Sequence, residues 1–333
     1  MREFQINSNE AGQRFDKYLK KLLSNAGSSF IYKMLRKKNI VLNGKKADGT
    51  EKLSEGDQVK LFLSDETFDK FAGNQETDGA YEVLLRLSKD FTSGSRKLPV
   101  LYEDADIIVI DKPVGMLSQK AKPEDISANE YILAWLIAKG ELTAEQFRTF
   151  RPSVCNRLDR NTSGLLIAGK TLNGLQEMAE ALKERSVEKY YRCIVKGEVK
   201  DELYVKGWLR KDEVSNRVEI LPETAAVTGD FKPIETAYRP VQRKNGYTEL
   251  EVHLITGRSH QIRAHLASLG HPIVGDAKYG DARINDTFRR KAGIRSQLLH
   301  ACRMVWPDGR TLKSMPGDNF HRAWKTICEM KTL

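Results

Sequence analysis

Asp159 is the side chain of this sequence best placed to do chemistry, because it lies between two arginines in the segment NRLDRNTSGLLIAGK. Arg157 precedes it by two residues and Arg160 follows it directly. A Thr-Ser-Gly turn and an apolar run from Leu165 to Ala168 come next, and such a run is typical of a buried strand. The segment predicts a carboxylate held on a turn at the start of a core strand. The same pattern is compatible with an ion pair that only closes a turn.

The composition is that of a globular protein with a surplus of positive charge. The 333 residues carry a net charge of +10, with a pI of about 9.3, and are enough for two domains. Such a charge favours a polyanionic partner, most commonly nucleic acid. The four cysteines are widely spaced, so we expect reduced thiols. The sequence begins without an apolar signal segment and has no run of membrane-spanning length. We therefore expect a cytoplasmic protein without a membrane partner.

Residues 1–63 form a small basic segment, with 13 Lys and Arg against 7 Asp and Glu. Apolar residues recur at helical spacing from Arg14 to Leu23, and a second helix is expected from about Ser28, with Ser28 or Ser29 as its N-cap. Strands joined by Asn-Gly and Gly-Asp turns follow. The second helix ends in a basic run of Lys33, Arg36, Lys37 and Lys38. Such a run is usually a solvated helix face, which is also suited to a phosphate backbone.

The rest of the chain divides into a linker and a larger domain. Residues 64–97 carry acidic residues and glycines with little periodicity, so we expect a linker with room for a short helix near Tyr81–Leu87. Beyond Leu98, apolar β-branched runs alternate with helical segments. The expected strands and helices are Ile107–Pro113, Leu165–Lys170, about Thr171–Glu184 (helix), Tyr190–Gly197, Tyr247–Gly257 and His260–Gly270 (helix). This order predicts an α+β domain over residues 98–333 with a mixed, largely antiparallel sheet, and not a doubly wound nucleotide fold.

Five segments occur together in an order that resembles one enzyme family. They are YEDADIIVIDKPVGM (Tyr102–Met116), NRLDRNTSG (Asn156–Gly164), KYYRCIVKG (Lys189–Gly197), LITGRSHQIRAHLASLGHPIVGDAKYG (Leu254–Gly280) and LLHA (Leu298–Ala301). The set resembles the signatures of the RluA family of RNA pseudouridine synthases, and the joint occurrence is far more specific than any one piece. The resemblance implies the pseudouridine synthase fold for the large domain.

The resemblance also implies a reaction and a catalytic set. Enzymes of this family detach uracil from its ribose within RNA, turn it, and rejoin it through carbon 5. Asp159 would be the essential carboxylate, which attacks the ribose C1′ or removes the 2′ proton. Arg263 would keep Asp159 charged and oriented; its alternative is a surface ion pair or a cap on its own helix. Tyr191 would stack beneath the flipped uracil and could move a proton at carbon 5, whereas a tyrosine in an alternating strand is otherwise a core residue.

The remaining positions implied by the resemblance are contacts to RNA. Arg157 would fill the gap left by the flipped uridine, or would contact a phosphate. The family usually has His where this chain has Asn156, which removes any proton relay from that position. The other expected RNA contacts in the large domain are Arg160, Arg258, His260 and Gln261.

Residues 12–63 resemble the S4 RNA-binding module. The resemblance rests on Arg14, Asp16, Leu19, the stretch Lys33–Lys38, Val41, Asn43, Gly44, Gly56 and Asp57. It implies that residues 1–63 are a small α/β RNA-binding domain whose contacts include Arg14, Lys33, Arg36, Lys37 and Lys38. Because such a module accompanies many family members that modify the large ribosomal RNA, we expect 23S ribosomal RNA as substrate rather than tRNA.

Other functions remain alternatives at this stage. His260 and His265 are five residues apart on the expected helix and do not share a face, so we expect no metal site. The sequence has no glycine-rich nucleotide loop, and an isomerisation needs no cofactor. We expect a monomer, as is common in the family. A non-catalytic RNA-binding or ribosome-assembly factor and a uridine glycosidase are the competing hypotheses.

Overall fold

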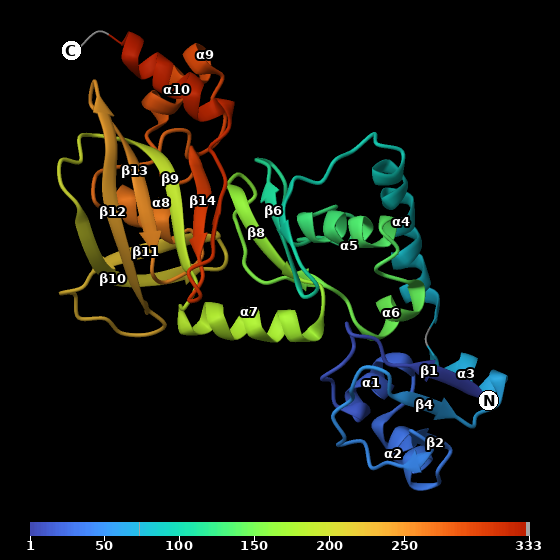
Figure 1. Ribbon diagram of the computed structural model, residues 1–333. Helices are drawn as coiled ribbons and strands as arrows, with labels where there is room; N and C mark the ends of the chain where they lie inside the picture. The colour runs from blue at the N-terminus through green and yellow to red at the C-terminus, as the bar shows by residue number, and fades with distance from the viewer. Residues whose placement is uncertain (73, 331–333) are drawn as a thin grey trace. The chain divides into compact units, whose positions relative to one another are not determined.

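The computed structural model describes residues 1–72 and 74–330, with the backbone alone for residues 74–78. These residues form two compact units, and the chain passes between them several times (Figure 1). The first unit contains Met1–Ile110, Gln119–Arg157 and Ile167–Glu180. The second contains Asp111–Ser118, Leu158–Leu166 and the chain from Ala181 onward. The segment around Asp159 therefore belongs to the second unit, although residues on either side of it belong to the first.

The N-terminal part of the first unit is a four-stranded antiparallel sheet with helices packed on it. In chain order its elements are β1 (Arg2–Gln5), α1 (Phe15–Leu22), α2 (Ser28–Arg36), β2 (Ile40–Leu42), β3 (Lys45–Lys46) and β4 (Gln58–Leu61), and the strand order is β1-β4-β2-β3. The two expected helices are confirmed. Their apolar stripes, including Phe15, Leu19 and Ile31, are fully buried in one core. The expected N-cap was wrong, because α2 begins at Ser28 itself and Gly27 is its N-cap residue.

The segment 64–97, expected as a linker with room for a short helix near Tyr81–Leu87, is largely helical. Two helices, α3 (Asp65–Ala72) and α4 (Asn74–Thr92), occupy it, and residue 73 lies outside the described part. Phe68 of α3 is buried in the N-terminal core. On α4, the Tyr81 hydroxyl donates to the Leu142 carbonyl, and the Phe91 ring meets the Trp135 ring edge to face. These anchoring residues are few and widely spaced, which is why the sequence shows little periodicity.

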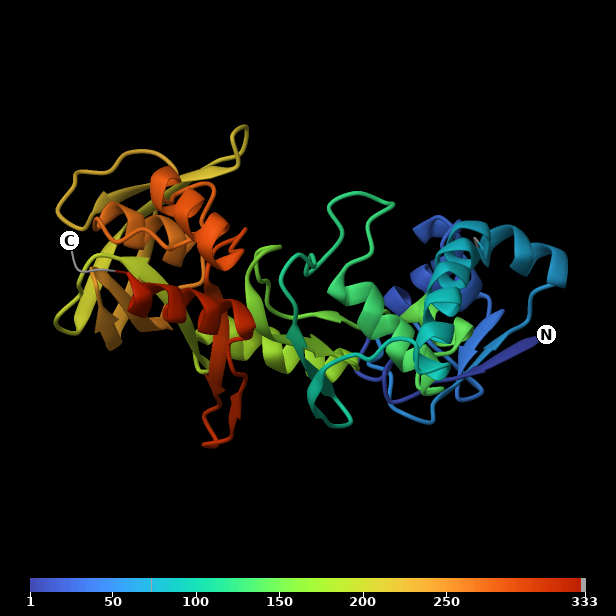
Figure 2. The same cartoon turned by 90° about the horizontal axis from the view of Figure 1, so that it is seen from above.

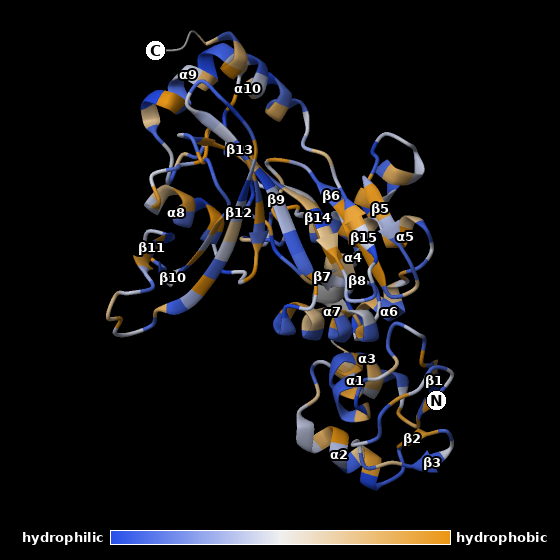
Figure 3. Ribbon diagram, turned by 60° about the vertical axis from the view of Figure 1, so that its left-hand side comes forward, coloured by the Kyte–Doolittle hydropathy of each residue, from blue (hydrophilic) through white to orange (hydrophobic). Residues whose placement is uncertain are grey.

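The remainder of the first unit surrounds an apolar helix. Its elements are β5 (Val100–Glu103), β6 (Ile107–Lys112), α5 (Ala128–Ala138), α6 (Ala144–Thr149) and β7 (Ser153–Val154), with part of β8 (Ser163–Gly169) and of α7 (Leu172–Glu184). Figure 3 shows α5 mostly in the orange of apolar residues. Ser127 and Thr143 begin α5 and α6 with capping boxes, which satisfy backbone N–H groups at both helix starts.

The second unit is built on long antiparallel strands. Its elements are β9 (Glu188–Lys196), β10 (Leu203–Asp212), β11 (Arg217–Pro222), β12 (Lys232–Lys244), β13 (Tyr247–Leu254), α8 (Gln261–Ser268), α9 (Ala282–Ala292), β14 (Leu299–Val305), β15 (Thr311–Lys313) and α10 (Asp318–Glu329). The strand order is β11-β10-β12-β13-β9-β14-β8. α8 lies against β11, and α9 packs with α10 (Figures 1 and 2). The pairing of β14 with β8 is parallel, so the predicted mixed, largely antiparallel sheet is confirmed.

Gly164 lets β8 approach β14 closely, directly after the turn that carries Asp159. It pairs with Ala301 and has a φ of +108°, a conformation suited to glycine. A Cβ atom at this position would overlap the Ala301 carbonyl oxygen. The Thr-Ser-Gly turn of the sequence therefore ends in a residue that cannot carry a side chain. None of the helices in the described ranges is long and apolar enough to cross a membrane.

Candidate active site

The Asp159 turn is fixed by hydrogen bonds on both sides. The Thr162 N–H donates to the Asp159 carbonyl at 3.0 Å and closes the turn. The buried Ser118 hydroxyl donates to the Leu158 carbonyl at 2.8 Å and accepts from the Leu158 N–H at 3.0 Å. The Asp159 side chain projects from this turn with 29% of its surface exposed. The carboxylate is therefore held by a rigid backbone and remains reachable.

Lys112 fixes the same loop by hydrogen bonds to its backbone, a role that was not predicted from the sequence. Its side chain is fully buried, and its Nζ donates to the carbonyls of Pro113, Met116 and Arg160 at 3.1, 2.8 and 3.2 Å. Burial lowers the pKa of Lys112 to about 8, against the opposing charge of Asp159. The signal in the sequence was a lysine at the end of a strand of mostly buried residues, where a charge is rare without a fixed partner.

One guanidinium, that of Arg263 on α8, bridges two carboxylates. Its Nη1 donates to Asp159 Oδ2 at 2.7 Å. Its Nε and Nη2 donate to the two oxygens of Asp276 at 2.7 and 2.9 Å. The structure therefore brings together Asp159 and Arg263, which the sequence paired by resemblance. It adds Asp276, which the sequence did not single out and whose side chain is completely buried.

The electrostatics of this bridge keep Arg263 and Asp276 ionised. Burial raises the pKa of Asp276, but hydrogen bonds and charge from Arg263 outweigh it and hold the pKa below its usual range. Burial lowers the pKa of Arg263, but the negative charges and hydrogen bonds of Asp276 and Asp159 raise it by more. The net shift of the Arg263 pKa is therefore upward. A bidentate pair of this kind fixes both position and charge. Arg263 is consequently a rigid cation beside Asp159.

Tyr191 lies on β9, between Val252 of β13 and Ala301 of β14. Its side chain is buried. Burial raises the pKa of the Tyr191 phenol well above its usual range, and the negative charge of Asp159 raises it further. The phenol is therefore protonated at neutral pH and is electrostatically coupled to Asp159. This position suits both a residue of the catalytic site and a core residue.

The two histidines of the third signature have different surroundings. His260 precedes α8 with a φ of 55°, and its Nε2 is 4.0 Å from Asp159 Oδ1. His265 is buried, and its Nδ1 is 3.2 Å from the Thr236 hydroxyl. The structure places His260, and not His265, next to the carboxylate. No group of three potential metal ligands occurs among residues 1–72 and 74–330.

Gln261 does not fit its expected role as an RNA contact. Its side chain is buried, and the amide nitrogen donates to the Glu235 carbonyl and the Thr236 hydroxyl. The amide oxygen accepts from the Thr256 hydroxyl and the Arg258 N–H. All hydrogen-bonding capacity of the amide is thus used inside the protein. The residue fixes the start of α8 instead of facing a ligand.

The expected arginine contacts and Asn156 have clear positions. Arg157, Arg160 and Arg258 are exposed. Asn156 accepts a hydrogen bond from the Ile167 N–H at 2.8 Å, so it ties the segment before Asp159 to β8. This contact gives a structural role to the one letter of the segment that departs from the family pattern.

In the N-terminal part, the basic residues gather at the end of α2. Arg14 is exposed and forms an ion pair with the buried Asp16 at 3.1 Å. The cations in the last turn of α2 and directly after it are all exposed, and they are Lys33, Arg36, Lys37 and Lys38. The surface of this part therefore offers several cations in one short stretch.

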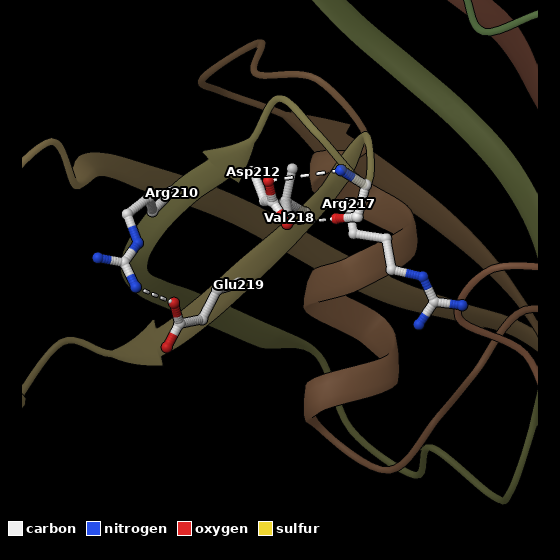
Figure 4. Close-up of a pocket in the computed structure, with 6 residues that line it drawn as sticks. Arg210, Asp212, Arg217, Val218 and Glu219 are labelled. Atoms are coloured by element: carbon white, nitrogen blue, oxygen red, sulfur yellow. Dashed lines mark hydrogen bonds and ion pairs between the residues drawn. The ribbon is translucent and has the colours of Figure 1, made fainter.

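A hollow lies on the β10–β11 hairpin of the second unit (Figure 4). It is lined by Arg210, Asp212, Ser215, Arg217, Val218 and Glu219. Arg210 and Glu219, both half exposed, form an ion pair at 2.7 Å that neutralises their charges. The hollow is a surface feature of the hairpin, and its Val218 is the residue that links the hairpin to the loop after α8.

Comparison with known proteins gives a consistent set of relatives. The model of the family described as RNA pseudouridylate synthase matches residues 106–268. The "Ribosomal large subunit pseudouridine synthase C" of Pasteurella multocida is 30% identical over 89% of this chain and 83% of its own length. Its namesake from Vibrio vulnificus is 29% identical over 93% of this chain and 90% of its own length.

The solved structure of "Human RNA Pseudouridylate Synthase Domain Containing 4" has a similar fold. It superposes with a TM-score of 0.56 and 20% identity, covering 74% of this chain and 97% of the human one. At this identity the likeness concerns the fold alone.

Proposed function

Since the chain belongs to the RNA pseudouridylate synthase family, we propose that it isomerises uridines of 23S ribosomal RNA to pseudouridine, with Asp159 as the catalytic carboxylate. The choice of RNA is supported by the names of the relatives, which refer to the large ribosomal subunit. The choice of residue is supported by one observation above all. Arg263 holds Asp159 Oδ2 at 2.7 Å, while the carboxylate remains partly exposed.

The geometry supports different tasks for the two oxygens of Asp159. Oδ2 is held by the guanidinium of Arg263, so Oδ1 would be the oxygen that attacks C1′ or takes the 2′ proton. If Asp159 attacks C1′, its bond to C1′ replaces the C1′–N1 bond and breaks again when carbon 5 bonds to C1′ in the turned uracil. If Asp159 takes the 2′ proton, the C1′–N1 bond breaks as the glycal forms, and that proton returns to C2′ when carbon 5 bonds to C1′. In both routes the carbon 5 proton leaves and N1 takes up a proton. Arg263 orients the carboxylate through its 2.7 Å hydrogen bond. The protonated Tyr191 side chain would stack beneath the flipped uracil.

The basic end of α2 supports RNA binding by the N-terminal part. We propose that residues 1–63 act as an S4-like module, with Arg14 and the cations of α2 on the phosphate backbone. Arg157, Arg160 and Arg258 are exposed in the large domain and would contact the RNA around the flipped uridine. The ribosomal substrate and the free cysteines support a place in the cytoplasm.

Release of tritium from 23S rRNA labelled at carbon 5 of uridine tests this proposal. We expect release by the wild type, loss of at least about 10⁴-fold in Asp159→Ala, and normal release by Asp286→Asn, a control on the exposed part of α9. Release from tRNA but not from 23S rRNA would transfer the substrate to tRNA. No release above the Asp159→Ala level on any cellular RNA would favour a non-catalytic RNA-binding factor. Free uracil on chromatography would indicate a glycosidase.

A further inference from the structure

Tyr279 connects the β10–β11 hairpin to His260, a side chain that lies beside Asp159 Oδ1. Its hydroxyl oxygen accepts a hydrogen bond from the Val218 N–H at 2.9 Å. The same hydroxyl lies 3.0 Å from His260 Nδ1. The other ring nitrogen of His260, Nε2, lies 4.0 Å from Asp159 Oδ1. A continuous chain of polar contacts thus runs from a hairpin backbone to the carboxylate.

The direction of these hydrogen bonds favours one position for the proton of His260. The Val218 N–H can only donate, so the tyrosine oxygen is the acceptor in that contact. The phenol can then donate its own proton to His260 Nδ1, which lies 3.0 Å away. Because Nδ1 then accepts, the proton of the neutral imidazole is on Nε2. The N–H of His260 therefore faces Asp159.

The charges around His260 support the neutral ring. Asp159, Arg263, Lys278 and Asp276 are the charged groups that act on it. Burial lowers the pKa of His260, and the opposing influences of the two carboxylates and the two cations do not reverse that shift. The backbone of His260 is left-handed, which is uncommon for a residue other than glycine and is typically kept at functional sites.

We propose that Tyr279 is a positioning residue, which holds His260 as the tautomer with its proton on Nε2 and thereby presents a neutral N–H donor to Asp159 Oδ1 and the bound ribose. This inference rests on the proposed function and extends it. With the opposite tautomer, a lone pair would face the carboxylate and repel it. The phenol of Tyr279 thus acts on Asp159 through His260, without contacting the carboxylate itself.

The first test is Tyr279→Phe, which removes the hydroxyl and keeps the ring that lies 5.3 Å from the Arg263 guanidinium. We expect kcat for tritium release to fall about tenfold, the value of one lost hydrogen bond, with KM for RNA unchanged. In ¹⁵N spectra of the imidazole, wild-type His260 should be protonated at Nε2, and Tyr279→Phe should show a mixture of tautomers. Tyr204→Phe, an exposed tyrosine bonded to Glu235, is the matched control.

A second test uses two replacements of His260 that differ in reach. Gln places an amide N–H near the position of Nε2, whereas Asn reaches only to Nδ1. We expect His260→Gln to keep more activity than His260→Asn. Backbone strain predicts the reverse order, because Asn tolerates the left-handed conformation best.

The proposal is overturned if His260 is protonated at Nδ1 in the wild type. It is equally overturned if Tyr279→Phe has wild-type kcat, or if the Asn variant is the more active of the two. The spectra can be read without turnover. An inactive wild type would therefore contradict the proposed function and still test the tautomer.

Discussion

Arg263 is shared unequally between its two carboxylates. Asp276 receives two of its hydrogen bonds and is completely buried, whereas Asp159 receives one and is partly exposed. Asp276 also accepts from the Lys278 and Tyr279 N–H groups, which fix it to the backbone. The position of the guanidinium is thus set by Asp276, and Asp159 meets a cation that is already in place. Preorganisation of this kind is the usual source of catalytic electrostatics.

Asp276→Asn should therefore impair catalysis without touching the substrate. The amide cannot form the bidentate ionic pair, so that Arg263 loses its fixed position. We expect kcat to fall about 10–100-fold, comparable to other residues that orient a catalytic group. The free energy of unfolding should fall by about 3 kcal/mol, because a buried cation loses a partner. Tritium release and urea unfolding measure the two effects, with Asp286→Asn as the exposed control. Activity within twofold of the wild type would contradict this assignment.

At the scale of elements, α8 shows what a sequence can and cannot predict. Its range was expected as His260–Gly270 and is Gln261–Ser268 in the structure. The buried strands beside the site also appeared near their expected positions, for example β13, which begins at Tyr247 as expected. Apolar periodicity identifies such elements because burial imposes it. In the segment expected as a linker, only a short helix near Tyr81–Leu87 was expected and the full extent of α3 and α4 was not, since few of their residues are buried.

Residue partners are harder to predict than elements. Asp159 and Arg263 are 104 residues apart in the chain, and only the family resemblance paired them. Asp276, Tyr279 and Lys112 were missed because their roles depend on contacts that arise from strand order. Hydrophobic alternation does not say which strand lies beside which. The Gln261 prediction failed for the same reason, as spacing cannot show that an amide is enclosed.

α8 also predicts a dependence of stability on pH through His265. Burial lowers the pKa of His265 to about 4, below its ordinary value of about 6.5. The unfolded chain therefore binds a proton that the folded protein does not, and stability falls as the pH drops from about 6.5 toward 4. The loss from this residue should be about 2 kcal/mol at pH 5 and about 3 kcal/mol at pH 4.

Urea unfolding at pH 7 and pH 5 measures this effect. His265→Asn should lower stability at pH 7, because a ring is removed from the core, but its further loss at pH 5 should be smaller than that of the wild type. His321→Asn, at an exposed position of α10, should follow the wild type. An equal loss in His265→Asn and the wild type would contradict the prediction.

At the scale of the whole molecule, the net charge of +10 makes RNA affinity dependent on salt. We expect the α2 cations to account for a distinct share. Replacement of Lys33, Arg36, Lys37 and Lys38 by Gln should weaken binding and reduce the slope of log affinity against log salt by up to about 3. The value of kcat at saturating RNA should not change, because the site is built by other residues.

The same change of charge on α9 provides the control. Replacement of Arg283, Arg289, Arg290 and Lys291 by Gln removes four exposed cations from the second unit. Filter binding across a salt series compares the two variants. If the α2 and α9 variants reduce the slope equally, the effect is one of net charge. That result would refute a specific contribution of the N-terminal part to RNA binding.

The place of β14 has a consequence for the protein during its synthesis. This strand, Leu299–Val305, lies between β8 and β9, and its neighbours are made more than a hundred residues earlier. Pairings of such high contact order form late. A nascent chain that has not yet released β14 from the ribosomal tunnel therefore has Tyr191 on β9 and the Asp159 turn before β8 without the strand that joins them. We expect such a chain to be inactive until β14 has emerged and paired with both neighbours.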